Sequence, residues 1–122
     1  MSIEAYKETV KESEDPRSME RRILSKVTRK IERAASTENG GDPSLNQELA
    51  EALDKNRLFW ATICHDLTDP ENAHEDTFKA SMLSLGISVD RETRSVLLHK
   101  EGRRSKIDTL IDINRKIIAG LS

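Results

Sequence analysis

The sequence predicts an all-α protein that folds as a single compact bundle of five or six helices, one helical domain over residues 1–122. Charged residues make up 34% of the chain and aromatic residues only 3%, a composition typical of helices with one apolar stripe and a charged outer face. The chain has 5 glycines and 3 prolines, too few for the many turns of a β-sandwich or barrel. Apolar residues also recur at three- and four-residue steps over long segments, which favours helices throughout.

Two helices are expected before the first loop. A short helix over 2–12 begins with Ser2 as its N-cap. The pair Asp15-Pro16 marks the start of the next helix, because Asp caps and Pro is tolerated at the first helical position. That helix ends before the loop 36–43, which is rich in Gly, Asn, Asp and Pro. The thin stripe of the first helix is Ile3, Tyr6 and Val10, and the stripe of the second is Met19, Ile23, Leu24, Val27, Ile31 and Ala34.

The third expected helix follows this loop and ends before an Asp-Pro turn. Ser44 and Gln47 form a capping box, with Ser44 at the N-cap and Gln47 at the third helical position. Leu58, Phe59 and Cys64 lie off the main stripe, so this helix is expected to be central and in contact on several sides. Its main stripe comprises Leu45, Leu49, Leu53, Asn56, Trp60, Ile63 and Leu67.

The last third of the chain carries the remaining helices. Residues 76–100 have a helical stripe that contains Gly86, which indicates either a close approach of another backbone or a bend; one helix and two helices both fit. The final helix is expected to begin at Ser105 as N-cap, with Asp108 in the capping-box place and Gly120 as a C-cap glycine. The two stripes are Phe78, Met82, Leu85 and Val89, then Ile107, Leu110, Ile111, Asn114, Ile117, Ile118 and Leu121.

Charge is unevenly distributed near the N-terminus, although the whole chain has a net charge of only −2. Residues 1–15 carry two basic and five acidic side chains, whereas residues 17–33 carry seven basic and two acidic ones. The simpler interpretation is that the first segment lies near the second and partly neutralises it; the alternative is a phosphate-binding stripe. Because the chain has no global basic excess, direct nucleic-acid binding is not expected.

No pattern of residues predicts catalysis or metal binding. The three histidines, His65, His74 and His99, do not stand at ligand spacing from one another or from Cys64, so no metal or cofactor is expected. Cys64 is interpreted as a small buried hydrophobe, because no paired base accompanies it. The single cysteine, the acidic N-terminus and the lack of a membrane-length apolar run predict a cytoplasmic protein. Because no catalytic constellation is found, the protein is not expected to be an enzyme.

Two asparagines interrupt apolar stripes. Asn56 and Asn114 each lie in the middle of a stripe, and each is followed by an arginine. Buried polar side chains need partners, so we expect the two amides to meet in the core, with the Trp60 indole N–H or a backbone group meeting the remaining demand. Trp60 is expected to lie in the same core. The alternative interpretation is that the asparagines make polar contacts inside a binding groove.

Several segments, in order along the chain, resemble one protein family. Residues 52–60, from Ala52 to Trp60, are similar to the "AL..NR.LW" segment of the flagellar biosynthesis regulator FlaF family of alphaproteobacteria. The charged stretch 90–94 departs from a more hydrophobic run in that family. The resemblance covers residues 3–121. The other matching segments are Pro16-Arg17 with Glu20, Asp69-Pro70-Glu71-Asn72, Ser84-Leu85, Leu110 to Ile117, and Gly120-Leu121.

The resemblance implies a cytoplasmic, non-enzymatic protein that is needed for flagellin production and export. Members of the family are described as positive regulators of flagellin synthesis, acting opposite the partner FlbT, and as flagellin-binding secretion chaperones. The expected partner is therefore flagellin, with FlbT as a second candidate and no membrane involved.

Two functions follow as hypotheses. A chaperone is expected to bind an amphipathic flagellin segment by helix-in-groove recognition, and Ile113, off the main stripe of the last helix, gives that helix a second apolar side. The alternative is a post-transcriptional regulator that contacts flagellin mRNA directly or through FlbT, although stretch 17–33 lacks the aromatic residues that stack on RNA. A scaffold subunit without a client is a further possibility. The candidate partner-binding residues are Asn56, Arg57, Trp60, Ile107, Leu110, Ile113, Asn114, Ile117 and Leu121.

Overall fold

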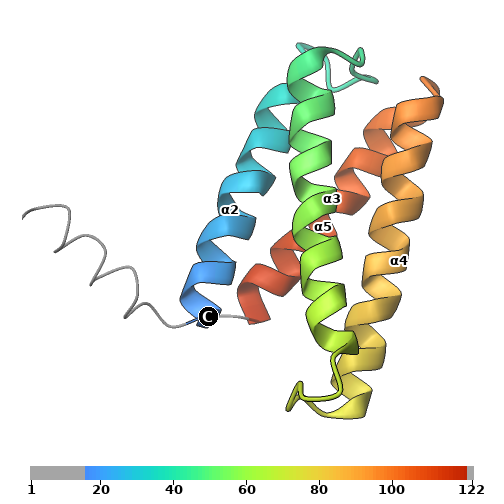
Figure 1. Cartoon of the computed structure of the whole chain (residues 1–122). Helices are drawn as coiled ribbons and strands as arrows, with labels where there is room; N and C mark the ends of the chain where they lie inside the picture. Colours follow the sequence, from blue (N-terminus) through green and yellow to red (C-terminus); the bar gives the residue numbers. More distant parts are fainter. Residues whose placement is uncertain (1–15, 121–122) are drawn as a thin grey trace, which may run out of the picture.

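The computed structural model describes residues 16–120, and within them four helices surround one core (Figure 1). The helices are α2 (Pro16–Ala34), α3 (Gln47–Thr68), α4 (Asp76–Leu98) and α5 (Arg103–Gly120). Successive helices run in opposite directions, and each packs against two neighbours: α2 and α4 both contact α3 and α5. The all-α class is confirmed. The described part has four helices and not five or six, because 76–98 form one helix and the helix expected over 2–12 lies outside the described residues.

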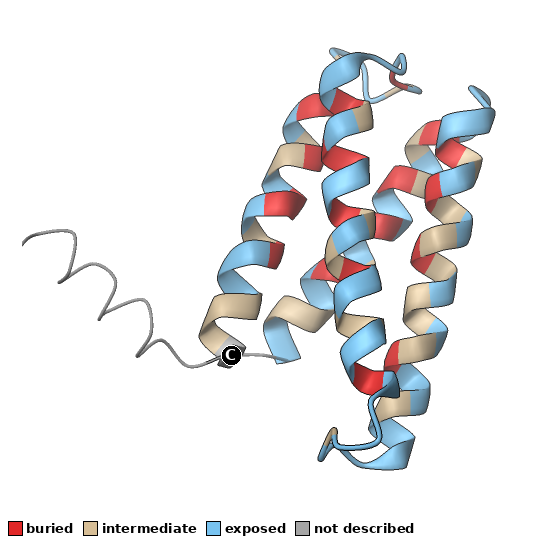
Figure 2. Cartoon of the chain, viewed as in Figure 1, coloured by how far each residue is buried: buried red, intermediate tan, exposed pale blue. Residues whose placement is uncertain are grey.

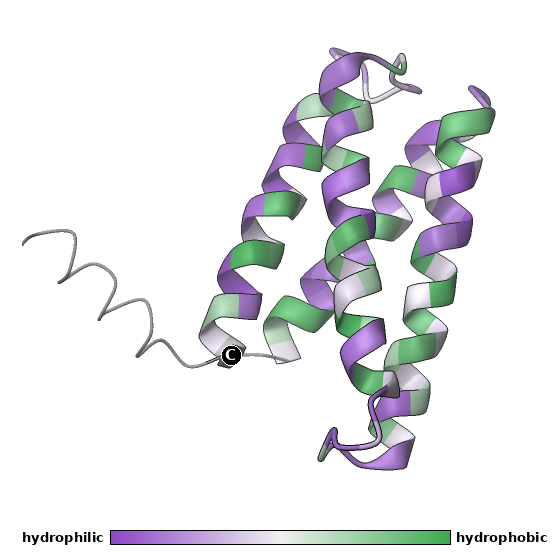
Figure 3. Cartoon of the chain, viewed as in Figure 1, coloured by the Kyte–Doolittle hydropathy of each residue, from purple (hydrophilic) through white to green (hydrophobic). Residues whose placement is uncertain are grey.

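Each helix turns one apolar stripe inward, so that buried residues line the inner side of the bundle (Figure 2) and hydrophilic residues lie mostly outside (Figure 3). The periodic stripes predicted this arrangement, because residues three and four apart share one helix face. The largest fully buried apolar side chains are Leu24, Ile31, Leu49, Leu53, Val89, Val96, Ile107 and Leu110. All four helices therefore contribute to a single core.

The helix α3 is not more central than the others, contrary to expectation. Each helix of the ring has two neighbours and leaves an outer face in solvent, and Leu58 on the outer face of α3 is 67% exposed. The expected first stripe residue, Leu45, precedes α3 and is 40% exposed. Of the apolar residues that lie off the main stripe of α3, Leu58 is therefore exposed, and Phe59 and Cys64 are half-buried.

The start of α3 differs from the expected capping box. Its N-cap is Asn46, whose Oδ1 accepts a hydrogen bond from the backbone N–H of Leu49 at 2.8 Å. Ser44 therefore lies outside the helix. Gln47 is its first residue, and its side chain donates to Glu51 at 3.0 Å instead of closing a capping box. The side-chain oxygen of Asn46 therefore has the capping role that was expected of the Ser44 hydroxyl.

The start of α5 also differs, because its cap comes from a distant loop. Asp42, between α2 and α3, accepts hydrogen bonds from the backbone N–H groups of Gly102 at 3.2 Å and Arg104 at 2.9 Å. The helix consequently begins before Ser105, which lies inside it. Gly102 has a φ of +72°, a conformation that glycine adopts without strain and that makes the tight turn from α4. Gly120, expected as a C-cap, is the last residue of the helix.

A buried arginine closes the same end of the bundle. Arg103 is only 6% exposed; its Nε donates to the Val96 carbonyl at 2.9 Å and its Nη1 to the Pro43 carbonyl at 3.1 Å. Val96 lies in the last turn of α4, where carbonyls have no partner within the helix. The next residue, Arg104, donates from Nε to the Gly41 carbonyl at 3.2 Å. These contacts attach the α2–α3 loop to α4 and α5.

The helix α4 is continuous through Gly86, which settles whether 76–100 form one helix or two. A Cβ at Gly86 would clash with the Sγ of Cys64 and would lie 3.9 Å from Cε3 of Trp60. The glycine therefore permits a close approach between α3 and α4. The close neighbour is the side chain of Cys64, whereas the sequence had left open a close approach of another backbone or a bend in the helix.

Candidate functional site

A hydrogen-bonded cluster of polar side chains lies in the middle of the core. Asn114 of α5 is fully buried, and its Nδ2 donates to Oδ1 of the equally buried Asn56 of α3 at 2.8 Å. Its own Oδ1 accepts from Nε1 of Trp60 at 2.9 Å. The prediction that the two amides meet, with the Trp60 indole supplying a further bond, is confirmed. The core position of Trp60 is also confirmed, because the residue is 2% exposed.

The cluster has a fourth member that the sequence analysis missed. Nδ2 of Asn114 also donates to Oγ1 of Thr28 on α2 at 3.1 Å, and that hydroxyl donates to the Leu24 carbonyl at 2.7 Å. The available signal was a hydroxyl in the middle of the α2 stripe. Nδ2 of Asn56 is buried without a hydrogen-bond partner among the described residues. The cluster therefore joins α2, α3 and α5 at one level and holds the Trp60 indole in place.

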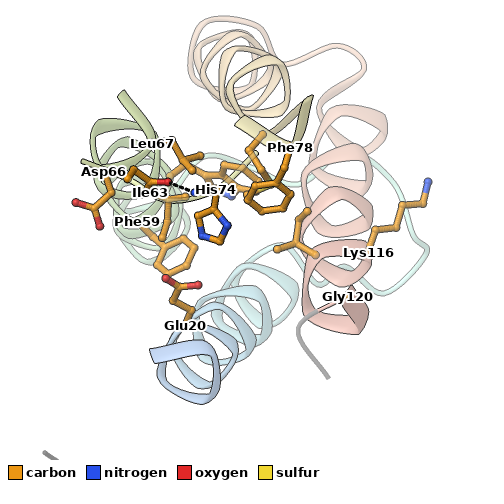
Figure 4. A pocket seen from close by; sticks show the side chains of 13 residues that line it. Glu20, Phe59, Ile63, Asp66, Leu67, His74, Phe78, Lys116 and Gly120 are labelled. Carbon is orange, nitrogen blue, oxygen red and sulfur yellow. Dashed lines mark hydrogen bonds between the residues drawn. The ribbon is translucent and has the colours of Figure 1, made fainter. Parts of the chain in front are cut away.

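An apolar pocket opens at the end of the bundle where α2 and α4 begin and α3 and α5 end. It has a volume of about 260 Å³ and receives side chains from all four helices. In Figure 4, Phe59 and Ile63 lie on one side of the pocket and Phe78 lies opposite them. Both phenylalanines of the chain and its one tryptophan line this pocket. Its apolar lining comprises Phe59, Trp60, Ile63, Leu67, Phe78, Met82 and Ile117.

The loop over 69–75 shapes the mouth of the pocket. Oδ1 of Asn72 accepts from the backbone N–H of His74 at 3.0 Å, and Lys79 donates from Nζ to the Asn72 carbonyl at 2.8 Å. The His74 ring then lies over Phe78, with ring centroids 4.7 Å apart (Figure 4). Phe78 remains 44% exposed. A large apolar side chain is thus held open to solvent at the rim of a cavity.

Charged side chains of both signs surround the apolar lining. Glu20 lies beside Phe59, and Asp66 stands on the outer side of α3 (Figure 4). Across the pocket, Lys116 extends outward and pairs with Asp112, with 2.9 Å between Nζ and Oδ2. An apolar interior with a charged rim suits an amphipathic segment, which can bury one face and leave the other in water.

Comparison with known protein families assigns the chain to a family. The family model described as flagellar protein FlaF matches residues 2–121, nearly the whole chain. The chain belongs to the flagellar protein FlaF family. This confirms the family that the sequence resembled, and it makes the chain a flagellar protein. Neither a curated protein nor a solved structure is significantly similar to it.

Most of the predicted partner-binding residues of this FlaF-family chain lie inside the bundle. Trp60 also lines the pocket, so it belongs both to the core and to the cavity wall. The buried residues among the nine candidates are Asn56, Trp60, Ile107, Leu110 and Asn114.

The other candidates are more accessible. Arg57 is half-buried and pairs with Asp90 of α4, with 3.1 Å between Nε and Oδ1. Ile113 is half-buried and packs against the core. Ile117 lines the pocket, and Leu121 lies outside the described residues. Partner binding by these residues stays a prediction, and Ile117 with Trp60 are the two that the structure brings to the cavity.

Sequence reasoning missed the rest of the pocket. It assigned Ile63 and Leu67 to the core stripe and treated Phe59 as an off-stripe residue. The available signal was aromatic: in a chain with 3% aromatic residues, Phe59 and Trp60 are adjacent and Phe78 stands near the start of the next helix. Aromatic side chains carry large apolar surfaces, so their meeting at one end of an antiparallel helix pair brings much apolar surface to that end.

Other chemistry in the described part is limited. Burial raises the pKa of the Cys64 thiol, which packs against Gly86. Between residues 16 and 120, no group of three or more His, Cys, Asp or Glu side chains is placed to hold a metal ion. Of the four described helices, none has the length and apolar character that crossing a membrane requires.

Proposed function

We propose that this FlaF-family protein is a cytoplasmic chaperone that binds flagellin before export and acts as a positive regulator of flagellin synthesis. The observation that supports this is the apolar pocket at the end of the bundle, where Phe59, Trp60 and Phe78 converge. The protein would act by binding and not as an enzyme, and it would need neither a metal nor a cofactor.

The pocket favours a helical client segment. Unpolymerised flagellin presents amphipathic terminal segments that aggregate, and a chaperone protects them by covering their apolar face. Burying one leucine or phenylalanine side chain contributes about 1.5–3 kcal/mol. Micromolar affinity requires about 8 kcal/mol after the costs of association, so several anchoring side chains must enter or flank the pocket. A cavity of about 260 Å³ with an exposed Phe78 at its rim can hold such anchors.

The polar cluster supports the same role. A binding wall must keep its shape without the client, and hydrogen bonding to Asn114 fixes the orientation of the Trp60 indole that forms part of the wall. Preorganisation of this kind lowers the entropic cost of binding. The charged rim, with Glu20 and Asp66 on one side and Lys116 on the other, would face the polar side of the client.

The regulatory effect would then be indirect. A chaperone that binds flagellin lowers the concentration of free flagellin, to which a regulator of flagellin synthesis would respond. FlbT is the second candidate partner through which this effect would act.

Exposed basic residues on α2 favour a second candidate, direct contact with flagellin mRNA. We consider it weaker because α2 carries no aromatic residue for base stacking. Replacing Arg21, Arg22 and Arg29 together by Glu is therefore expected to leave retention of flagellin mRNA unchanged in a filter-binding assay at physiological salt. Tight, sequence-selective binding by the unmodified protein that this variant loses would favour the mRNA hypothesis.

The chaperone proposal is tested by one charge placed in the pocket and one placed outside it. Phe78→Glu puts a carboxylate at the pocket rim, whereas Ile87→Glu changes a 69% exposed residue of the same helix that does not line the pocket. Calorimetric titration with purified monomeric flagellin should show binding weakened at least about tenfold by Phe78→Glu, or about 1.4 kcal/mol. The control should bind as the unmodified protein does. Equal affinity of the two variants, both with native helical circular dichroism, would contradict the proposal.

A further inference from the structure

The apolar pocket opens beside a run of carboxylates. Residues 65–76, which end α3 and connect it to α4, contain five acidic side chains and no lysine or arginine. Asp66 lines the pocket, and each of the other four stands one or two residues along the chain from a lining residue. All five are exposed. We call them the acidic margin of the pocket: Asp66, Asp69, Glu71, Glu75 and Asp76.

No direct counter-charge accompanies the acidic margin. Among residues 16–120, none of its carboxylates takes part in an ion pair. Two lysines lie near the same opening, and both have other partners. Lys79, next to Phe78, donates from Nζ to the Asn72 carbonyl at 2.8 Å, and Lys116 pairs with Asp112 of its own helix. The charge of the acidic margin therefore faces solvent.

Three of the five carboxylates have a role in the local structure. Oδ1 of Asp69 accepts a hydrogen bond from the backbone N–H of Glu71 at 2.9 Å, which shapes the turn after α3. Glu75 is at the N-cap position of α4 and Asp76 is in its first turn, where the helix dipole favours negative charge. Asp66 and Glu71 are left without such a role.

The position of Asp66 is unfavourable for the helix that carries it. Asp66 stands in the last turn of α3, which ends at Thr68, and the partial negative charge of a helix C-terminus disfavours a carboxylate there. Within the described part, Glu71 contributes to the turn only through its backbone N–H. A cation that binds beside the pocket would stabilise both side chains.

We propose that the segment which enters the pocket is cationic: an amphipathic helix that carries lysine or arginine beside its apolar anchors. This inference rests on the proposed function and specifies the chemical class of its client. The acidic margin is not a binding site by itself, because the pocket supplies the contact surface. The carboxylates select the charge of what enters, since an apolar cavity beside charges of one sign strengthens their field.

The charges are expected to discriminate between clients more than to supply affinity. Exposed ion pairs are individually weak, so two of them change an affinity only several-fold. Like charges in the same places oppose binding by a similar factor. An acidic segment with the same apolar face is therefore disfavoured, which is how a pocket of general apolar character becomes selective.

Two helical peptides test this preference. They share one leucine face and differ only in whether lysine or glutamate occupies the polar face. Calorimetric titration of the full-length protein at low salt should show the lysine peptide binding at least about tenfold more tightly. Raising the salt should reduce the difference, because exposed charges are screened. Emission of Trp60, the one tryptophan of the chain, should change on binding because it lines the pocket. Equal affinities, tighter binding of the glutamate peptide, or no binding of the lysine peptide would overturn the inference.

Neutral variants locate the preference. Asp66→Asn with Glu71→Gln removes the two carboxylates that lack a local structural role, and should reduce the preference about fivefold. The matched control, Asp54→Asn with Glu101→Gln, changes the net charge equally at exposed positions that do not line the pocket, and should keep the preference. Both variants should retain native circular dichroism and Tm. A preference that the first variant leaves unchanged, or that both variants reduce equally, would overturn the inference.

Monomeric flagellin separates this inference from the proposed function. Flagellin should bind Asp66→Asn with Glu71→Gln less tightly than it binds the unmodified protein or the control. If it binds all three equally, the proposed function stands and the cationic client is wrong. If it binds none of them while the lysine peptide keeps its preference, the proposed function fails and the charge selectivity of the pocket stands.

Discussion

Asn114 is the hub of the polar cluster, and its replacement by leucine should be the most costly single change there. The amide bonds to Trp60 at 2.9 Å, Thr28 at 3.1 Å and Asn56 at 2.8 Å. Leucine would leave the indole N–H and the Asn56 oxygen buried without partners, at about 1–3 kcal/mol each. Thr28 would keep its hydrogen bond to Leu24. We expect Asn114→Leu to lower the free energy of unfolding by about 3 kcal/mol, a large part of the 5–15 kcal/mol typical of domains.

Replacing Asn56, the partner of Asn114, should lower the free energy of unfolding by a smaller amount. Asn56→Leu removes one acceptor of Asn114, whose Nδ2 still bonds Thr28, and it also removes the unpartnered Nδ2 of Asn56. We expect a loss of about 1 kcal/mol. In the double variant no Asn56 oxygen remains to be stranded, so the combined loss should fall short of the sum by about 1–2 kcal/mol. The Trp60 N–H stays unpaired, so recovery is partial.

Urea unfolding, followed by circular dichroism and Trp60 fluorescence, measures these free energies. The matched control is Thr93→Val on α4, where a fully buried hydroxyl bonds only the carbonyl of Val89, away from the cluster. Its effect should add to that of Asn114→Leu. If the losses from Asn56→Leu and Asn114→Leu also add within about 0.5 kcal/mol, the two amides do not share a network and the reasoning is refuted.

Three further outcomes are expected. Trp60→Ala should lower the free energy of unfolding by about 3–5 kcal/mol, and a measured loss below about 1 kcal/mol would show that the side chain is not a core anchor. Gly86→Ala should cost about 1–3 kcal/mol by forcing a methyl group against Cys64. Combining Gly86→Ala with Cys64→Ala should recover part of the lost free energy of unfolding. If none is recovered, the added methyl group does not clash with Cys64. Because burial raises the pKa of Cys64, the thiolate forms only at higher pH than in the unfolded chain. Iodoacetamide should therefore react more slowly at pH 8 with folded than with urea-unfolded protein, and equal rates would contradict that shift.

The helices and the core polar contact were predictable because both depend on periodicity. Stripes at three- and four-residue steps fixed which face of each helix is buried, and Asn56 and Asn114 stood mid-stripe on two helices that each needed an apolar neighbour. Desolvation of an unpaired amide is costly, so the partner had to be another polar side chain nearby. The role of Thr28 in the cluster was not predicted, because a threonine hydroxyl can donate to a carbonyl of its own helix and then needs no distant partner.

The ends of the helices could not be predicted in the same way. The cap of α5 is Asp42, about sixty positions before the groups it binds, so the local sequence pointed to Ser105 instead. Arginine side chains are mostly exposed in proteins, yet the hydrogen bonds of Arg103 to the carbonyls of Val96 and Pro43 allow its burial. The pocket is also a property of four helix ends together, and no single stripe reveals it. Phe78 was read as a core residue but stands 44% exposed at the rim.

The central claim, that a flagellin segment enters the pocket, is tested most directly by amide NMR mapping of the isotope-labelled full-length protein titrated with purified monomeric flagellin. The largest shifts are expected at Phe59, Phe78 and Ile117, which line the pocket on three different helices. Largest shifts at Leu58 and Ile87, exposed on α3 and α4 outside the pocket, with the pocket signals unmoved, would contradict the claim.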